Sequence, residues 1–428
     1  MIRRVILITV LAATLFAIPL VTAADSDERT VVRITYLNQG DLERLASTFD
    51  IWEVRRAEHV VVAAVSSLEL AELAALGYQV EVDEAKTLKM RTPRAPAPDQ
   101  VAGIPGYPCY RTVEETYAAL QTLATAHPDL VTLIDIGDSW EKTIPGGAAG
   151  YDLWAAILTN HAIPGPKPVF FLMAEIHARE YVTAETALRF AEGLVNGYGT
   201  DADATWLLDY FEVHVVPMTN PDGRKKAEAG LEWRKNTDSD DGCTSPSSWG
   251  TDLNRNSAFK WGGAGSSSSP CDETYHGPSM ASEPEVQAIQ AYILAVLPDQ
   301  RGPGDTDPAP ATAMGVVITL HSYSGLVLWP WGWTNSAAPN DAALVTFGRK
   351  LAYFNDYTPE QSVGLYPTTG STDDWAYGIL GVASYTFEMG NEFFEDCAPF
   401  QSTILPDNMA ALRYAFKACR RPYQTPAG

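Results

Sequence analysis

Between Tyr107 and Arg421 the chain alternates short apolar runs of strand character with segments of helical spacing. Alternation of this kind favours an α/β domain. Several of the runs are almost continuously apolar, which is typical of strands covered on both faces. We therefore predict a mixed, mostly parallel central sheet flanked by helices. The clearest strands are expected at 153–158, 169–174, 211–216, 314–320 and 383–387, and the first helix at 112–126.

A smaller unit is predicted before this domain, over residues 25–85. Its β-rich and helical segments alternate along the chain, in the order 30–36, 41–49, 59–65, 67–76 and 78–82. The helical segments begin with Asp or Ser, which are good helix-capping residues. The β-α-β-α-β order predicts a compact α+β open-faced sandwich.

Residues 86–106 form the predicted linker between this unit and the main domain, which spans 107–428. Four prolines keep the linker extended, and four Lys or Arg residues make it basic. An exposed basic linker of this kind suits an activating protease that releases a pro-segment. An ordinary flexible tether is the alternative, and finding residues 30–82 still attached to the active protein would favour it.

The N-terminus has the pattern of an export signal. Two arginines precede an apolar run over residues 5–21, and small residues follow it. We predict a signal peptide over residues 1–24, with cleavage near Ala23 or Ala24. An uncleaved membrane anchor is the alternative, but the run is short for a membrane span and Pro19 interrupts it. The processed protein is expected to be secreted and free of the membrane.

The charge balance limits the partners of the chain. Acidic residues outnumber basic ones by 53 to 30, which gives a formal net charge of −23. This charge repels phosphate backbones and argues against nucleic-acid binding. It favours a cationic or neutral substrate, although salt screens so diffuse a field.

The cysteines fit an exported chain. There are five of them: Cys109, Cys243, Cys271, Cys397 and Cys419. Pairing is the default expectation in an oxidising compartment, and an odd count leaves one thiol over. No C-x-x-C motif is present, which argues against a structural zinc cluster.

Two of the seven histidines stand apart, while the other five are expected to be structural. His177 and His321 each follow an apolar strand-like run, at the end where α/β sheets usually place ligands. Glu180 lies three positions after His177, at the start of a predicted helix. Such a His-x-x-Glu match alone arises by chance about half the time in a chain of this composition. With His321 it gives two His and one Glu, a set used by catalytic zinc with a fourth position open to water.

Hydrolysis at such a zinc also needs a general base and a positive group for the developing oxyanion. Glu388 ends another strand-like run and could enter the same crevice. Arg234 and Arg255 offer guanidinium groups, which grip carboxylates through paired hydrogen bonds. Taken singly, each of these three would most often be a solvated or salt-bridged residue.

Nine short segments carry a resemblance to a known family. In chain order they are His177-Ala-Arg-Glu180, Asn220-Pro-Asp-Gly223, Trp233-Arg-Lys235, Asp252-Leu-Asn-Arg-Asn256, Cys271-Asp-Glu-Thr-Tyr-His-Gly277, His321-Ser-Tyr-Ser324, Tyr366, Asp374-Trp375 and Phe387-Glu388. In this order they resemble the zinc carboxypeptidases of the M14, or funnelin, family, in its secreted pro-enzyme A/B branch. The resemblance covers nearly all of residues 107–421, and the 25–85 unit lies where the family has its propeptide. It implies the zinc carboxypeptidase fold and an enzyme that hydrolyses the C-terminal peptide bond of peptides and proteins.

The resemblance also implies the catalytic roles. His177, Glu180 and His321 would bind one Zn²⁺ per chain. Glu388 would be the general base that takes a proton from the zinc-bound water and later passes it to the leaving amine. Arg234 would polarise the scissile carbonyl and stabilise the oxyanion.

Further matching positions imply substrate-binding roles. Asn254 and Arg255 would hold the terminal carboxylate, Tyr366 would close over it, and Arg179 would contact the peptide further from the cut. A buried arginine fork accepts a free carboxylate but leaves an internal peptide without a partner, so it selects chain ends. Leu231 departs from the pattern, because many relatives have an arginine there that assists substrate entry.

The same comparison bears on the cysteines. It implies a disulfide between Cys243 and Cys271 across the loop that separates them. Cys397 and Cys419 would then be a plausible second pair, which leaves Cys109 unassigned.

The preferred chain end is predicted from Asp373. It falls where family members that remove Lys or Arg have a pocket carboxylate, which would pair with a basic side chain. Leu365, Thr368, Gln361 and Thr386 resemble the other pocket walls. Some microbial relatives combine such a carboxylate with a broad preference. We therefore expect activity on basic C-termini, with tolerance for apolar ones.

We expect a secreted pro-carboxypeptidase that acts as a monomer. Two other functions are possible alternatives. A deacylase of N-acyl amino acids shares a similar zinc set, but the pro-segment and the Asn254-Arg255 pair count against it. A catalytically dead peptide-binding module usually lacks a ligand or the base, and here none is missing. The sequence does not decide whether calcium stabilises the long loops.

Overall fold

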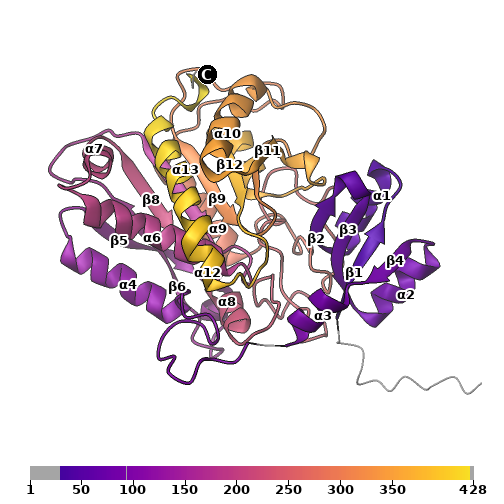
Figure 1. Cartoon of the computed structure of the whole chain (residues 1–428). Helices are drawn as coiled ribbons and strands as arrows, with labels where there is room; N and C mark the ends of the chain where they lie inside the picture. Colours follow the sequence, from indigo (N-terminus) through magenta and orange to yellow (C-terminus); the bar gives the residue numbers. More distant parts are fainter. Residues whose placement is uncertain (1–28, 93, 425–428) are drawn as a thin grey trace, which may run out of the picture.

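The computed structural model describes residues 29–92 and 94–424, so the predicted signal peptide at 1–24 and its cleavage site lie outside the described residues. The described residues form two units, each with its own hydrophobic core. Figure 1 shows the N-terminal unit in indigo and violet against one side of the larger domain.

A mixed sheet runs through the larger domain. Its strands are β5 (Val131–Asp138), β6 (Asp152–Leu158), β7 (Val169–Ala174), β8 (Glu212–Val216), β9 (Val316–His321), β10 (Leu326–Trp329), β11 (Thr358–Gln361) and β12 (Ala383–Glu388). Within the described part of the chain they form an eight-stranded sheet in the order β11-β10-β12-β9-β7-β8-β6-β5. Four neighbouring pairs are parallel and three are antiparallel. The predicted mixed, mostly parallel sheet is confirmed.

Helices cover both faces of this sheet. One face carries α4 (Val113–Ala126), α6 (Tyr181–Gly197), α7 (Ala202–Tyr210), α10 (Asp341–Asn355) and α13 (Leu405–Ala418), and the other carries α9 (Pro284–Val296) and α11 (Thr372–Leu380). In β7, Phe170 and Leu172 point into the first core while Phe171 and Met173 point into the second. Because successive side chains of a strand face opposite ways, a continuous apolar run serves both cores.

The helices of residues 29–92 and 94–424 include none that is both long enough and apolar enough to cross a lipid bilayer.

The strongest predicted elements have nearly the expected bounds. The strand at 169–174 matches β7, and the strand expected at 314–320 is β9 at 316–321. The side chain of Thr112 caps α4 by accepting a hydrogen bond from the backbone N–H of Glu115. The Glu115 carboxylate in turn accepts a hydrogen bond from the backbone N–H of Thr112. Strand β11 was not predicted, because its sequence Thr-Pro-Glu-Gln is short and polar.

The N-terminal unit is a small antiparallel sheet with helices. Its elements are β1 (Thr30–Thr35), α1 (Gln39–Thr48), β2 (Asp50–Arg55), β3 (Val60–Val65), α2 (Ser67–Ala75), β4 (Gln79–Val82) and α3 (Glu84–Arg91), with the strand order β2-β3-β1-β4. The structure adds β2 and α3 to the predicted order. The start of the predicted linker is therefore helical: Asp83 caps α3 through the backbone N–H of Lys86, and the prolines begin only at residue 93.

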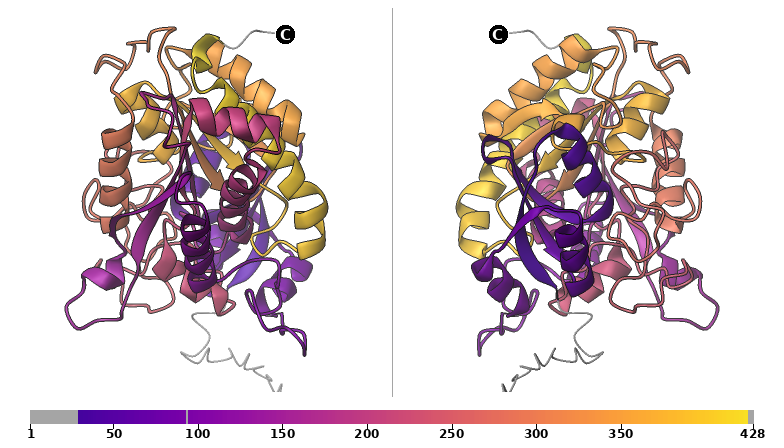
Figure 2. Two further views of the ribbon diagram at one scale, coloured as in Figure 1. Left: turned by 90° about the vertical axis from the view of Figure 1, so that its left-hand side faces the viewer. Right: turned by 90° about the vertical axis from the view of Figure 1, so that its right-hand side faces the viewer.

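The two faces of this small sheet pack against different partners. In β3, Val61 and Ala63 belong to the core formed with α1 and α2. Val62 belongs instead to a cluster with Tyr323 and Phe393 of the larger domain. The sheet therefore lies between its own helices and the larger domain, and the right-hand view of Figure 2 shows the unit in front of that domain.

Two disulfides are present among the described residues. They join Cys109 to Cys397 and Cys243 to Cys271, and Cys419 is a buried free thiol. The pair expected between Cys397 and Cys419 is therefore wrong. Cys397 begins α12 (Cys397–Pro399), before α13, while Cys419 directly follows α13. The 14 residues of α13 separate them by about 20 Å, too far for a disulfide.

Candidate zinc and peptide-binding site

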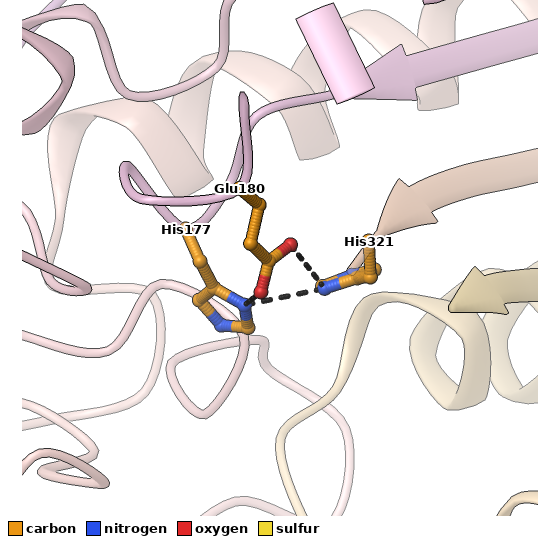
Figure 3. Close-up of side chains that lie close together, drawn as sticks. All are labelled: His177, Glu180 and His321. Atoms are coloured by element: carbon orange, nitrogen blue, oxygen red, sulfur yellow. Dashed lines mark hydrogen bonds and ion pairs between the residues drawn. The ribbon is translucent and has the colours of Figure 1, made fainter. Parts of the chain in front are cut away.

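Two strand ends bring the predicted zinc ligands together. β7 ends at Ala174, and the turn after it carries His177 before Glu180 starts α6 as its N-cap residue. His321 is the last residue of β9, which pairs with β7 in parallel. Parallel neighbours end at the same edge of a sheet, so the three side chains converge there, as Figure 3 shows.

The geometry of these three side chains fits a metal ion. His177 Nδ1 lies 2.8 Å from Glu180 Oε1 and 3.2 Å from His321 Nδ1, which in turn lies 3.4 Å from Glu180 Oε2. All three residues are at most 3 % exposed. Two imidazole nitrogens and a carboxylate that face one another in a buried space can hold a shared cation. Zinc suits two imidazoles and one carboxylate, and no further His, Cys, Asp or Glu of the described residues joins the group.

Asp252 holds two of the site residues in position. Its Oδ1 lies 3.1 Å from His177 Nε2, and its Oδ2 accepts hydrogen bonds of 3.1 Å and 2.8 Å from Arg234. Burial alone would raise the pKa of Asp252, but Arg234 and His177 outweigh it and hold the pKa well below its ordinary value. A carboxylate behind a ligating histidine fixes the orientation of the imidazole ring. The sequence placed Asp252 in a motif but gave no sign of this role.

Glu388 lies beside the three ligands. It is the last residue of β12 and pairs with His321 across the parallel β12–β9 ladder. Burial raises the pKa of Glu388 to about 7, against the opposing effect of His321 and Arg234. A carboxylate that titrates near neutrality is suited to general-base catalysis.

The predicted receptor for the chain end lines the same cavity, which has a volume of about 60 Å³. Asn254, Arg255 and Tyr366 contribute to its walls together with Glu388. Arg255 is 2 % exposed and donates hydrogen bonds to the carbonyl oxygens of Gly265 at 2.7 Å and Asn254 at 3.0 Å. These bonds fix the guanidinium group in the wall of the cavity.

Asp373 is a further buried residue in the wall of this cavity. Its carboxylate accepts hydrogen bonds from the hydroxyls of Ser362 at 2.8 Å and Ser371 at 2.7 Å, and from the backbone N–H of Asp374 at 2.9 Å. These three hydrogen bonds fix the orientation of the Asp373 carboxylate in the cavity wall. Among the other expected walls, Leu365, Thr368 and Thr386 line the cavity.

Gln361, also expected as a wall, has its side chain bound elsewhere. Its amide donates hydrogen bonds to the carbonyl oxygens of Trp331, Thr334 and Ser336.

The N-terminal unit binds Arg179 and closes part of the cavity. Asp50, the first residue of β2, accepts two hydrogen bonds of 2.7 Å from the Arg179 guanidinium, and both side chains are buried. The next three residues, Ile51, Trp52 and Glu53, line the catalytic cavity. A segment that sequence analysis treated as a connection thus occupies the approach to the site.

One other group of carboxylates in the described chain is close enough to hold a cation. It consists of Asp135, Asp138 and Asp152 near the surface, where the Lys142 ammonium group already bridges Asp138 and Asp152. It offers no buried donor set comparable with that of the histidine site.

Comparison with known proteins agrees with this geometry. The family model for zinc carboxypeptidases (peptidase M14) matches residues 116–412. The chain therefore belongs to the zinc carboxypeptidase family, and it is a metallocarboxypeptidase.

Individual relatives match over most of the chain. Carboxypeptidase A2 of Rattus norvegicus is 33% identical over 70% of this chain and 67% of its own length. A zinc carboxypeptidase of Saccharothrix mutabilis subsp. capreolus is 32% identical over 66% of this chain and 62% of its own length. The match thus spans about two thirds of these relatives.

Solved structures share the fold. Carboxypeptidase A from Helicoverpa armigera superposes with a TM-score of 0.73 at 22% identity, over 93% of this chain and 98% of that one. Thrombin activatable fibrinolysis inhibitor gives a TM-score of 0.70 at 22% identity, over 92% of this chain and 99% of that one. Because these matches cover nearly the whole described chain, the expected carboxypeptidase fold is confirmed.

Proposed function

We propose that the chain is the secreted pro-enzyme of a zinc carboxypeptidase that removes single residues, preferably Lys or Arg, from peptide C-termini. The observation that carries this proposal is the convergence of His177, Glu180 and His321 beside Glu388, in one cavity with Arg255.

The chemistry divides between a base and a positive group. A zinc ion held by the two histidines and Glu180 would supply Lewis acidity toward the scissile carbonyl and toward the attacking water. Glu388 would take the proton from that water and later deliver it to the leaving amine. Arg234, held by the two hydrogen bonds that it donates to the Asp252 carboxylate, would stabilise the charge that develops on the carbonyl oxygen.

Recognition of the chain end would fall to Arg255, Asn254 and Tyr366. A free carboxylate of the substrate would pair with the buried guanidinium group of Arg255, whereas an internal peptide has no carboxylate to offer it. This difference makes release from the chain end the expected reaction.

Asp373 would select the released residue. Its carboxylate is held by three hydrogen-bond donors and lies in the cavity wall, where an ammonium or guanidinium group could pair with it. The aliphatic and hydroxyl walls at Leu365, Thr368 and Thr386 would also accept apolar side chains. We therefore expect a preference for basic ends without strict exclusion of others.

The N-terminal unit would keep the enzyme inactive until the linker is cut. Asp50 forms an ion pair with the Arg179 guanidinium group, and Trp52 lines the catalytic cavity. A substrate peptide and this unit would therefore compete for the same space. Cleavage at a basic residue between 86 and 106 would free the unit. Export of the chain would bring it to the activating protease.

The test uses the full chain before and after treatment with a Lys/Arg-specific protease. A mixed peptide pool is incubated with each sample, with and without a zinc chelator, and the released amino acids are identified. The proposal predicts single C-terminal residues, rich in Lys and Arg, only from the cut sample and only without chelator. Release of N-acyl groups would instead indicate a deacylase, and binding without release would indicate a dead module.

A further inference from the structure

A second cavity of about 200 Å³ lies next to the catalytic one. The two cavities share three wall residues, Trp52, Tyr323 and Phe393. Trp52 belongs to the N-terminal unit, so once that unit has left, a peptide whose C-terminus is bound at Arg255 can continue past Tyr323 and Phe393 into the second cavity. We call this second cavity the outer groove.

Charge is divided sharply between the two sides of the outer groove. The basic residues that line it are Lys86, Lys89 and Arg94, and all three belong to α3 or the linker. The acidic ones are Glu228, Glu232 and Glu392, and all three belong to the catalytic domain. When the N-terminal unit and linker leave, the groove keeps its acids and loses its cations.

Acidic and aromatic side chains of the catalytic domain contact these three basic residues. Lys89 forms an ion pair with Glu392, whereas Lys86 pairs with Glu53 of its own unit at 2.8 Å and lies 5.5 Å from the centre of the Tyr323 ring. Arg94 forms an ion pair with Asp396 and lies 4.8 Å from the centre of the Tyr107 ring. Carboxylates and aromatic faces together are a common receptor for ammonium and guanidinium groups.

Glu232 still lacks a cation in this arrangement. Among the described residues its Oε2 is a buried oxygen without a hydrogen-bond partner. Burial raises the pKa of Glu232 to about 7, while Arg179 acts in the opposite direction. A buried carboxylate is stabilised by a paired cation, so the groove has room for one more positive group.

We propose that the outer groove binds basic residues upstream of the scissile bond, and that Lys86, Lys89 and Arg94 occupy it in place of a substrate in the uncut chain. The inference rests on the proposed carboxypeptidase function. It adds a second determinant of substrate specificity to Asp373, which would contact only the released residue. The preferred substrate is then a peptide with a basic C-terminal segment rather than a single basic end.

The test compares peptides that share the same C-terminal residue. One set carries Lys, and the other its neutral counterpart norleucine, at each of the three positions before that residue. Each peptide is given to the protease-cut protein and to its Glu232→Gln/Glu392→Gln variant. We expect the cut protein to favour the Lys set at least about fivefold in kcat/KM, mainly through KM, and the variant to lose most of that preference.

A matched variant controls for the loss of two negative charges. Glu192→Gln/Asp203→Asn removes two carboxylates that pair with Arg111 and Lys417, away from the groove, and should keep the preference. Equal kcat/KM for the two sets, or an unchanged preference in the Glu232→Gln/Glu392→Gln variant, would overturn the inference alone. If neither set is hydrolysed by the cut protein, the proposed function fails and the inference fails with it.

Discussion

Replacing Asp50 with alanine should weaken the docking of the N-terminal unit and make the uncut protein active. The Asp50–Arg179 pair is buried, with Asp50 3 % and Arg179 1 % exposed and two hydrogen bonds of 2.7 Å. In the variant, the docked state leaves the arginine buried without a partner, whereas the undocked state exposes it to water. Removing one partner of a buried ion pair costs about 3–5 kcal/mol. The docking equilibrium should therefore shift by about 150-fold to about 4,000-fold toward the open form.

A second pair across the same interface provides the comparison. Arg56 and Glu360 are partly exposed, at 46% and 20% of their side chains. Exposed ion pairs contribute at most about 1 kcal/mol, so Arg56→Ala should shift docking by no more than about fivefold. Each variant removes one ion pair, so the large difference between them follows mainly from burial; Asp50→Ala also removes the hydrogen bond that the Trp52 indole donates to Asp50 within the N-terminal unit.

The assay is C-terminal residue release by the uncut chain from a short peptide in excess. Asp50→Ala should show clear activity without protease treatment, while the parent and Arg56→Ala stay near background. Each variant is then cut in the linker to measure its full activity, which shows whether the catalytic domain is intact. An Asp50→Ala chain that is silent when uncut but fully active when cut would refute the argument.

The remaining predictions concern pH and the catalytic cavity. Arg179 outweighs burial and holds the pKa of Asp50 below its ordinary value of 3.8, so docking is favoured above that pH and weakens as the pH falls through the pKa of the docked state. After linker cleavage, the N-terminal unit should therefore co-elute with the catalytic domain in gel filtration at pH 7 and separate from it in acid. The Asp50→Ala variant should show no such pH-dependent step. Glu388→Ala should lower kcat by about 100-fold to about 10,000-fold while zinc content by atomic absorption is unchanged. In the parent, kcat/KM should fall as the pH drops below about 7, because burial raises the pKa of Glu388 and only the unprotonated base accepts a proton. Arg255→Ala should raise KM by at least about 30-fold, since it truncates one partner of a buried charge pair with the substrate; a normal KM would place the chain-end receptor elsewhere. Asp373→Ala should abolish the preference for hippuryl-Arg over hippuryl-Phe, and an unchanged ratio would reject its role.

Residues at strand ends could be predicted because their positions depend on local pattern and sheet topology. His177 and His321 follow apolar runs that had to be buried strands, and parallel strands end at one edge. Glu388 follows for the same reason, since β12 lies beside β9. The sequence therefore carried enough information to predict that these four side chains lie together.

Contacts between distant segments could not be predicted in the same way. The Asp50–Arg179 pair spans 129 positions and depends on how two separate cores dock. The bond from Asp252 to His177 depends on the path of a long loop. The disulfide partner of Cys109 lies 288 positions away, and only the three-dimensional position of α13 excludes Cys419. Helix α3 was missed because the basic residues and prolines around it suggested an extended tether.

The central claim is that two imidazoles and one carboxylate hold a zinc ion whose fourth corner is free of protein. Anomalous diffraction at the zinc absorption edge, from crystals of the full chain, tests it directly. We expect one strong peak about 2.0–2.2 Å from nitrogen atoms of His177 and His321 and from a carboxylate oxygen of Glu180, with no other protein atom in that range. A fourth protein ligand on the zinc, or a peak bound by other residues, would contradict it.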